Sequence, residues 1–153
     1  MALARITPPP HNDQRGAGLI EILVAVLVVS IALIGIVRMQ LASMRNAESA
    51  YTANQATLLA YAVIDAMRSD RIAALDRRYN LPKTCSTTVS ASGLIADVQT
   101  EWLKTIKSAL GNHSGTCGEI SCEGTDCRVQ IYWDDSRATD GAPEASIEVR
   151  TRL

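Results

Sequence analysis

A single carboxylate, Glu21, lies at the edge of an apolar segment. Residues 22–37 contain no polar side chain except that of Ser30. Because an acid at the centre of a membrane-spanning helix costs roughly 2.5–3.5 kcal/mol, an ionisable residue beside such a segment indicates a function. The alternative interpretation is that the Glu21 carboxylate simply lies among the lipid headgroups at the membrane surface and has no further role. Gly16, five residues upstream and preceded by the basic residues Arg5 and Arg15, favours a specific role for Glu21.

This pattern resembles the cleavage and methylation motif of type IV pilins and of the pseudopilins of type II secretion. In that family a membrane aspartic peptidase cuts after a glycine and methylates the new N-terminal amine, and the fifth mature residue is a glutamate. The resemblance implies cleavage between Gly16 and Ala17, N-methylation of Ala17, and a role for Glu21 in subunit assembly. The chain departs from the family at Ala17, usually Phe or Met, and at Gly18, usually Thr or Ser.

The apolar segment is predicted to remain in the mature protein, because the cleavage site precedes it, whereas an ordinary secretory signal is cut after its apolar region. With Leu19 and Ile20 the segment approaches the roughly 20 residues of a bilayer span. Arg5 and Arg15 favour a cytoplasmic N-terminus, although basic residues also follow the segment. The resemblance implies a leader (1–16), a transmembrane and fibre-core half-helix (17–37), and a periplasmic head domain (38–153).

The four cysteines, Cys85, Cys117, Cys122 and Cys127, all follow the apolar segment. An even number in a small exported domain favours two disulfides, with three possible pairings. The alternative, a metal site made with His113, lacks the C-x2-C spacing typical of structural zinc. We expect Cys122 and Cys127 to pair across a strand turn. Cys85 and Cys117 would then form the second bond.

Composition argues against several function classes. The 153 residues have a net charge of −1, so no basic footprint for nucleic acid is visible. The chain also contains no phenylalanine, which argues against an aromatic platform for stacking bases. No phosphate-binding, zinc-protease or serine-hydrolase motif occurs. The two histidines, His11 and His113, form no recognisable catalytic dyad. We therefore expect no enzymatic activity, no cofactor, no resident metal and no nucleic-acid partner.

A long helix is predicted from Ala17 to near Arg77, because no proline interrupts this stretch. Such a helix would be about 90 Å long. Its first half is apolar on all sides, which is typical of burial in lipid or among similar helices. Its second half has an apolar stripe that we expect to pack against its own domain. That stripe comprises Leu41, Met44, Tyr51, Leu58, Ala62 and Met67.

A second helix is predicted over residues 93–110, capped by Ser92. Its apolar face would comprise Leu94, Val98, Trp102, Leu103, Ile106 and Leu110. Alternating apolar residues predict strands around residues 129–134 and 147–152, and a shorter strand around residues 119–122. The predicted fold class is α+β and type IV pilin-like. A long N-terminal helix would pack on a small antiparallel sheet, with one additional helix.

Two further segments narrow the resemblance. Residues 55–61 followed by residues 65–70 look like the helix pattern of type IV pilus modification proteins of the PilV type, in which Q-A-x-x-L-A precedes an Asp and a Met-Arg pair. Asp97, Glu101, Trp102 and the strand at residues 129–134 are similar to that family as well. The alternative interpretation of Asp65 and Arg68 is an ordinary ion pair between residues three apart on the surface of a helix.

This resemblance implies a minor type IV pilin that helps initiate pilus assembly at the inner membrane. It would enter the pilus or its tip complex and support twitching motility and adhesion. The implied partners are the prepilin peptidase, other minor pilins, the major pilin, the inner-membrane assembly platform and, before assembly, membrane lipid. One alternative is a minor pseudopilin of type II secretion. A DNA-binding competence pilin is disfavoured, because the charges beyond Val37 are mixed in sign.

Overall fold

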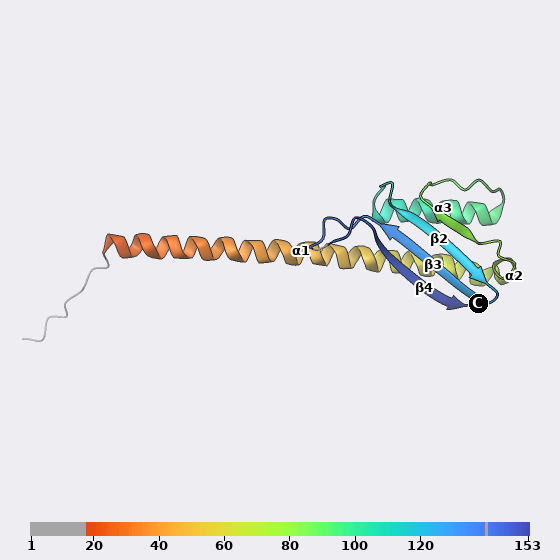
Figure 1. The fold of residues 1–153 in the computed structure, drawn as a ribbon, viewed down its shortest axis with the longest axis horizontal. Coiled ribbons are helices and arrows are strands. Elements are labelled where there is room, and N and C mark those ends of the chain that lie inside the picture. The colour runs from red at the N-terminus through yellow and green to blue at the C-terminus, as the bar shows by residue number, and fades with distance from the viewer. Residues whose placement is uncertain (1–17, 140) are drawn as a thin grey trace, which may run out of the picture. The chain divides into compact units, whose positions relative to one another are not determined.

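The computed structural model describes residues 18–139 and 141–153. The chain divides into two units at Met39 and Gln40, and the long helix α1 (Leu19–Ser69) contributes to both. The second unit also contains helices α2 (Arg71–Leu75) and α3 (Leu94–Leu110). Its strands are β1 (Leu81–Thr84), β2 (Cys117–Glu123), β3 (Asp126–Trp133) and β4 (Ala145–Arg152). The α+β class is confirmed, with a four-stranded sheet and one additional long helix (Figure 1).

The predicted long helix forms, but it ends earlier than expected, at Ser69. The backbone at Asp70 has φ −120° and ψ 56°, which lies outside the helical region, and α2 begins at the next residue. The prediction of one helix to near Arg77 was therefore wrong. The reason is tertiary, because the change of direction buries Ala73 and Ala74 of α2, and Tyr79 after it, in the core.

The face of α1 that packs on the domain is not the predicted stripe. Of the six stripe residues only Met67 is buried, and the others are exposed. The buried residues of α1 are Ala56, Ala60, Val63, Ile64 and Met67. Small side chains at Ala56 and Ala60 let the helix backbone approach its neighbours closely, whereas rows of large apolar side chains do not.

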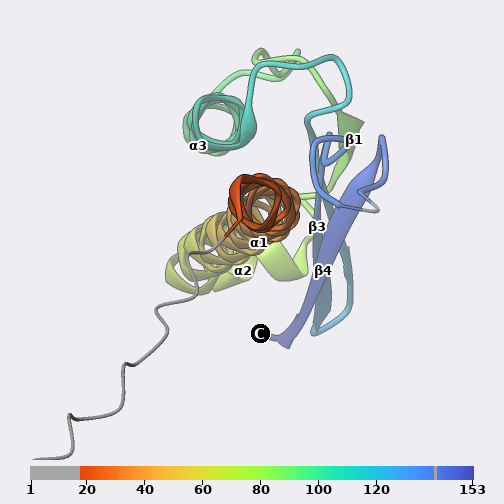
Figure 2. The same cartoon turned by 90° about the vertical axis from the view of Figure 1, so that its left-hand side faces the viewer.

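The sheet is antiparallel in the order β1-β2-β3-β4. The inner faces of β2 and β3 contribute Ile120, Val129, Ile131 and Trp133 to one core cluster with α1, α2 and α3. Figure 2 shows α1 and α3 on the same side of the sheet. The alternation predicted for residues 129–134 is confirmed.

A two-residue turn joins β2 to β3. Glu123 pairs with Asp126, so the turn contains only Gly124 and Thr125. Gly124 has φ 59°, a left-handed conformation that favours glycine. The turn therefore sets the register of the hairpin, in which Cys122 lies directly opposite Cys127.

Strand β1 is not among the strands predicted from the sequence. Pro82 cannot donate a ladder hydrogen bond, and β1 lies at the edge of the sheet, where a proline is tolerated. Leu81 pairs with Ile120, far along the chain, so no local pattern revealed the strand.

Helix α3 forms close to its predicted bounds, but two details differ. Gly93, with φ 106°, occupies the N-cap position and no side chain caps the helix, so the assignment of Ser92 was wrong. Leu94 is 75% exposed and lies outside the core. The buried side of α3 instead includes Gln99, whose Nε2 donates a hydrogen bond to the Tyr79 carbonyl oxygen at 2.8 Å.

Candidate functional site

Glu21 lies in the first turn of α1, near the start of the described chain. The backbone N–H of Glu21 donates to the Gly18 carbonyl oxygen at 2.9 Å, a bond of the first turn of the helix. The positive end of the helix dipole favours a negative charge at this position. Gly16 and Ala17, the predicted cleavage and methylation residues, lie outside the described residues.

The apolar segment after Glu21 is exposed along its length. Every large apolar side chain from Ile22 to Val37 is at least 50% exposed. By length and composition, α1 is able to cross a membrane. Ser30, the polar exception, donates its hydroxyl to the Val26 carbonyl oxygen at 2.7 Å. The segment therefore leaves no side-chain hydroxyl unpaired, as an apolar environment requires.

The four cysteines form two disulfides, Cys85–Cys117 and Cys122–Cys127. The predicted pairing is confirmed. Cys122 and Cys127 face each other across the β2–β3 register. Because all four sulfur atoms are used in these bonds, the alternative metal site with His113 has no thiolate available.

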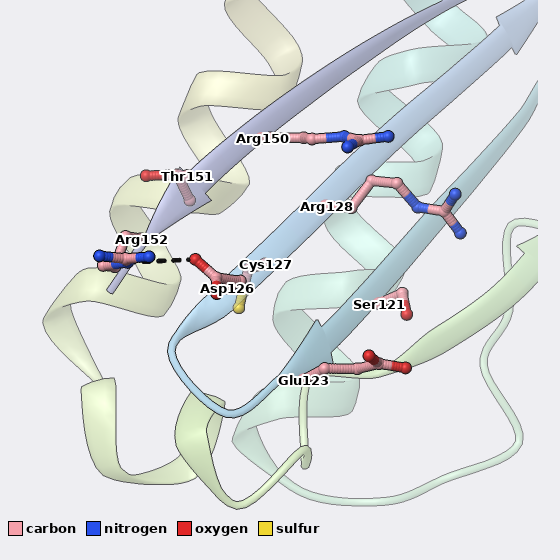
Figure 3. A pocket seen from close by; sticks show the side chains of 8 residues that line it. All are labelled: Ser121, Glu123, Asp126, Cys127, Arg128, Arg150, Thr151 and Arg152. Carbon is pink, nitrogen blue, oxygen red and sulfur yellow. Dashed lines mark hydrogen bonds and ion pairs between the residues drawn. The ribbon is translucent and has the colours of Figure 1, made fainter.

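One depression on the described surface lies over the charged outer face of the sheet. It has a volume of about 760 Å³ and is shown in Figure 3. Arg128 forms ion pairs with Glu119 and Glu148, and Arg152 pairs with Asp126. Each of these two guanidinium groups already has a carboxylate partner. The lining includes hydroxyl groups but no histidine, so it presents no paired nucleophile and base.

A second depression, of about 310 Å³, includes Ser49, His113, Asp134 and Asp135 in its lining. The Ser49 hydroxyl donates to Asp135 Oδ2 at 2.6 Å and ties the β3–β4 connection to α1. Hydrogen bonds from Ser136 lower the pKa of Asp134 below its usual value. The serine thus bonds to a carboxylate and not to the imidazole, which differs from a hydrolase triad.

Sequence reasoning missed an exposed apolar surface on α1 and α3. The stripe with Met44, Tyr51 and Leu58 was interpreted as core, yet each of these side chains is exposed. The available signal was the spacing, since these three residues recur every seven positions. Such a repeat is typical of a helix that packs against another helix.

Comparison with known proteins identifies the N-terminal segment. Residues 11–37 match the family model described as the Prokaryotic N-terminal methylation motif. The match includes Gly16, Ala17 and Glu21, and it ends before the residues that resemble pilus modification proteins. No match was found among curated proteins or among solved structures. The chain therefore carries an N-terminal methylation motif at residues 11–37, which include Gly16, Ala17 and Glu21.

Proposed function

We propose that this chain is a minor type IV pilin that helps initiate pilus assembly at the inner membrane. The observation that carries the proposal is the methylation motif at residues 11–37, which overlaps a helix long and apolar enough to cross a membrane. The resemblance of residues 55–70 and 129–134 to pilus modification proteins supports the minor role. The function is that of a scaffold, with no substrate turned over.

The proposed organisation follows from the same motif. Residues 1–16 form the leader, residues 17–37 the membrane and fibre-core half of the helix, and residues 38–153 the periplasmic head. The two disulfides of the head support a periplasmic location, because such bonds persist in oxidising compartments. Cleavage after Gly16 by the prepilin peptidase would expose the amine of Ala17.

Glu21 is proposed to set the stagger between neighbouring subunits. When apolar helices leave lipid and bundle in a fibre, this carboxylate loses its water. A cation of a neighbouring chain within about 4 Å would return roughly 4 kcal/mol at an effective dielectric constant near 20. The methylated ammonium of a neighbour's residue 17 is the natural partner. A wrong register would leave a buried charge unpaired, which is strongly unfavourable.

Deletion of the gene tests the proposal. We expect fewer surface pili and reduced twitching motility, while the major pilin remains present in the membrane and enzyme secretion is unchanged. Loss of secreted enzymes with normal piliation would instead identify a type II secretion pseudopilin. If the chain dominates purified pili by mass, the initiator role is wrong, although the pilin class is retained.

A further inference from the structure

Strand β4 forms an open edge of the sheet. In the described part of the chain it pairs with β3 alone, and no strand lies on its other side (Figure 1). Its eight residues contain no proline, and their register with β3 is continuous. The opposite edge, β1, is only four residues long, contains Pro82 and has an irregular register with β2. Short length, proline and irregular pairing protect an edge against further strands, and β4 has none of these three features.

The backbone groups that face away from β3 belong to alternate residues of β4. The Leu153 N–H donates to the Thr125 carbonyl oxygen at 2.9 Å, so these two residues form a hydrogen-bonded pair of the antiparallel ladder. Hydrogen-bonded pairs alternate along such a ladder, so the odd-numbered residues of β4 bond to β3. The N–H and C=O groups of the even-numbered residues therefore point to the open edge. These residues are Ser146, Glu148, Arg150 and Arg152.

The side chains of these four residues lie on the outer face of the sheet and set its charge along the edge. The side chains of Arg150 and Arg152 are each 77% exposed. The side chain of Glu148 is only 30% exposed and forms ion pairs with Arg128 and Arg150. A strand added to β4 would place its own outward side chains beside this row, at intervals of two residues. Carboxylates at that spacing match Arg150 and Arg152, whereas basic side chains do not.

The inner side of the edge is apolar and incompletely covered. Ile147 and Val149 pack against the core but remain partly exposed. The Arg68 guanidinium of α1 donates to Thr151 Oγ1 at 3.1 Å, which places this side of the helix next to β4. Tyr61 is 48% exposed and precedes Arg68 by seven residues, so it lies on the same side of α1. Inward apolar side chains of an added strand would pack against Ile147, Val149 and Tyr61.

A second copy of the chain offers no strand that matches this edge. Its β1 contains Pro82, which lacks an amide donor, and Lys83, which brings a cation toward the arginines. Extension of the antiparallel sheet by a second β4 requires a two-fold axis perpendicular to the sheet. That axis would also reverse residues 40–69 of α1, which run along one face of the sheet (Figure 1 and Figure 2). Two subunits anchored in one membrane run in the same direction, so this pairing is excluded.

We propose that the open edge of β4 binds an extended segment of a different protein, which adds to the sheet as an antiparallel strand. The segment alternates apolar side chains, which face α1, with carboxylates, which lie beside Arg150 and Arg152. Main-chain hydrogen bonds supply the attraction, and the two arginines select the sequence. The inference goes beyond the scaffold role by assigning the head a docking site. Only the exclusion of a second copy rests on the proposed function, because it requires a common membrane anchor.

Peptide binding to the full-length chain in detergent tests the edge. The probe is a fluorescent peptide of alternating valine and glutamate, eight residues long like β4. We expect anisotropy to show binding, weakened about tenfold or more when lysine replaces glutamate. In an antiparallel addition the glutamate amides face β4 and the valine amides face away. N-methylation of the glutamate amides should therefore abolish binding, and N-methylation of the valine amides should not. Absence of binding, or equal binding of all peptides, would overturn the proposal.

Two substitutions at one position separate the backbone from the side chain. Glu148→Pro removes an amide donor at the open edge without breaking the ladder to β3, whereas Glu148→Ala removes the same carboxylate and keeps the amide. The proline variant should bind the glutamate peptide about tenfold more weakly than the alanine variant. Equal affinities would contradict the proposal. Urea unfolding checks that both variants are folded, and if the proline variant is not, the two N-methylated peptides decide.

Photocrosslinking in cells identifies the occupant. A benzoylphenylalanine probe at Ser146 should give an adduct with a different protein, and the cross-linked segment, located by mass spectrometry, should carry carboxylates two residues apart. Glu148→Pro should remove the adduct, and Glu148→Ala should retain it. An adduct with a second copy, an adduct that the proline leaves unchanged, or no adduct would overturn the proposal. If gene deletion leaves pilus number unaltered while the adduct persists, the pilus role fails and the docking edge stands.

Discussion

Trp102 and Gly118 lie in direct contact where α3 crosses the sheet. A Cβ atom added to Gly118 of β2 would lie 2.6 Å from Cζ3 of the Trp102 ring. The same ring donates its hydrogen bond to the Leu59 carbonyl oxygen of α1. Trp102 therefore connects three elements, and the absence of a side chain at Gly118 permits the connection.

Gly118→Ala should destabilise the head by about 1–3 kcal/mol, because the added methyl group overpacks the Trp102 ring. Urea unfolding of the detergent-solubilised full-length chain, followed by tryptophan fluorescence, measures the loss. Gly115→Ala is the matched control, since a Cβ at that position has no atom within 4 Å. Equal loss of stability in both variants would contradict the packing argument.

Processing is expected between Gly16 and Ala17. Mass spectrometry of the mature protein should show a chain that begins at Ala17 with one added methyl group. Gly16→Leu should leave the leader attached, because the peptidase of this family cuts after glycine. An intact Met1 start, in cells with an active prepilin peptidase, would exclude the prepilin assignment.

Glu21→Ala should still insert into the membrane and be cleaved, but it should fail to restore piliation in a deletion strain. Because removal of a charge favours insertion into the membrane, the loss of piliation would reflect a defect in pilus assembly. Glu21→Gln keeps nearly the same size without the charge and should fail equally. Normal pilus number with the glutamine variant would show that the charge is not required.

The two disulfides should contribute unequally to stability. The Cys85–Cys117 bond joins residues 32 positions apart, and Cys122–Cys127 joins residues 5 positions apart. In the chain-entropy model these loops correspond to about 3.5–4 and about 2 kcal/mol, respectively. Replacement of each pair by serines, followed by urea unfolding, measures both values. A larger loss of stability on replacement of Cys122 and Cys127 than on replacement of Cys85 and Cys117 would contradict the expected order.

Tyr132 should ionise at a higher pH than an ordinary tyrosine. The pKa of Tyr132 is raised to about 12. Burial is the main cause, and the hydrogen bond that the Tyr132 hydroxyl donates to Glu119 Oε2 at 2.9 Å is the second. Because the folded state holds this proton more tightly than the unfolded state, its contribution to stability is complete below pH 10. That contribution declines as the pH rises toward 12. The difference in tyrosinate absorbance between the native protein and Tyr132→Phe should titrate near the upper value. A midpoint near 10 would disprove the shift.

Local patterns predicted much of the fold. The alternation of Val129, Ile131 and Trp133 specified both a strand and its buried face, because successive side chains of a strand point to opposite sides. The positions of Cys122 and Cys127 around a short turn specified their pairing for the same reason. The prediction of a role for Glu21 likewise rests on its neighbours along the chain alone.

Strand β1 and the end of α1 depend on distant contacts. Leu81 becomes part of a strand only because Ile120 pairs with it. The break at Asp70 is stabilised by burial of Ala73, Ala74 and Tyr79 against the rest of the core. Neither feature has a strong local signal, since Pro82 argues against a strand and no proline or glycine occurs at the break.

The sequence by itself determined that α1 is a helix, that its first part is apolar on all sides, and that its second part carries an apolar stripe. Only the tertiary structure decided which face of that second part packs on the domain. Ala56 and Ala60 are buried because close approach of the helix to its neighbours requires small side chains. The larger Met44, Tyr51 and Leu58 are consequently left on the surface.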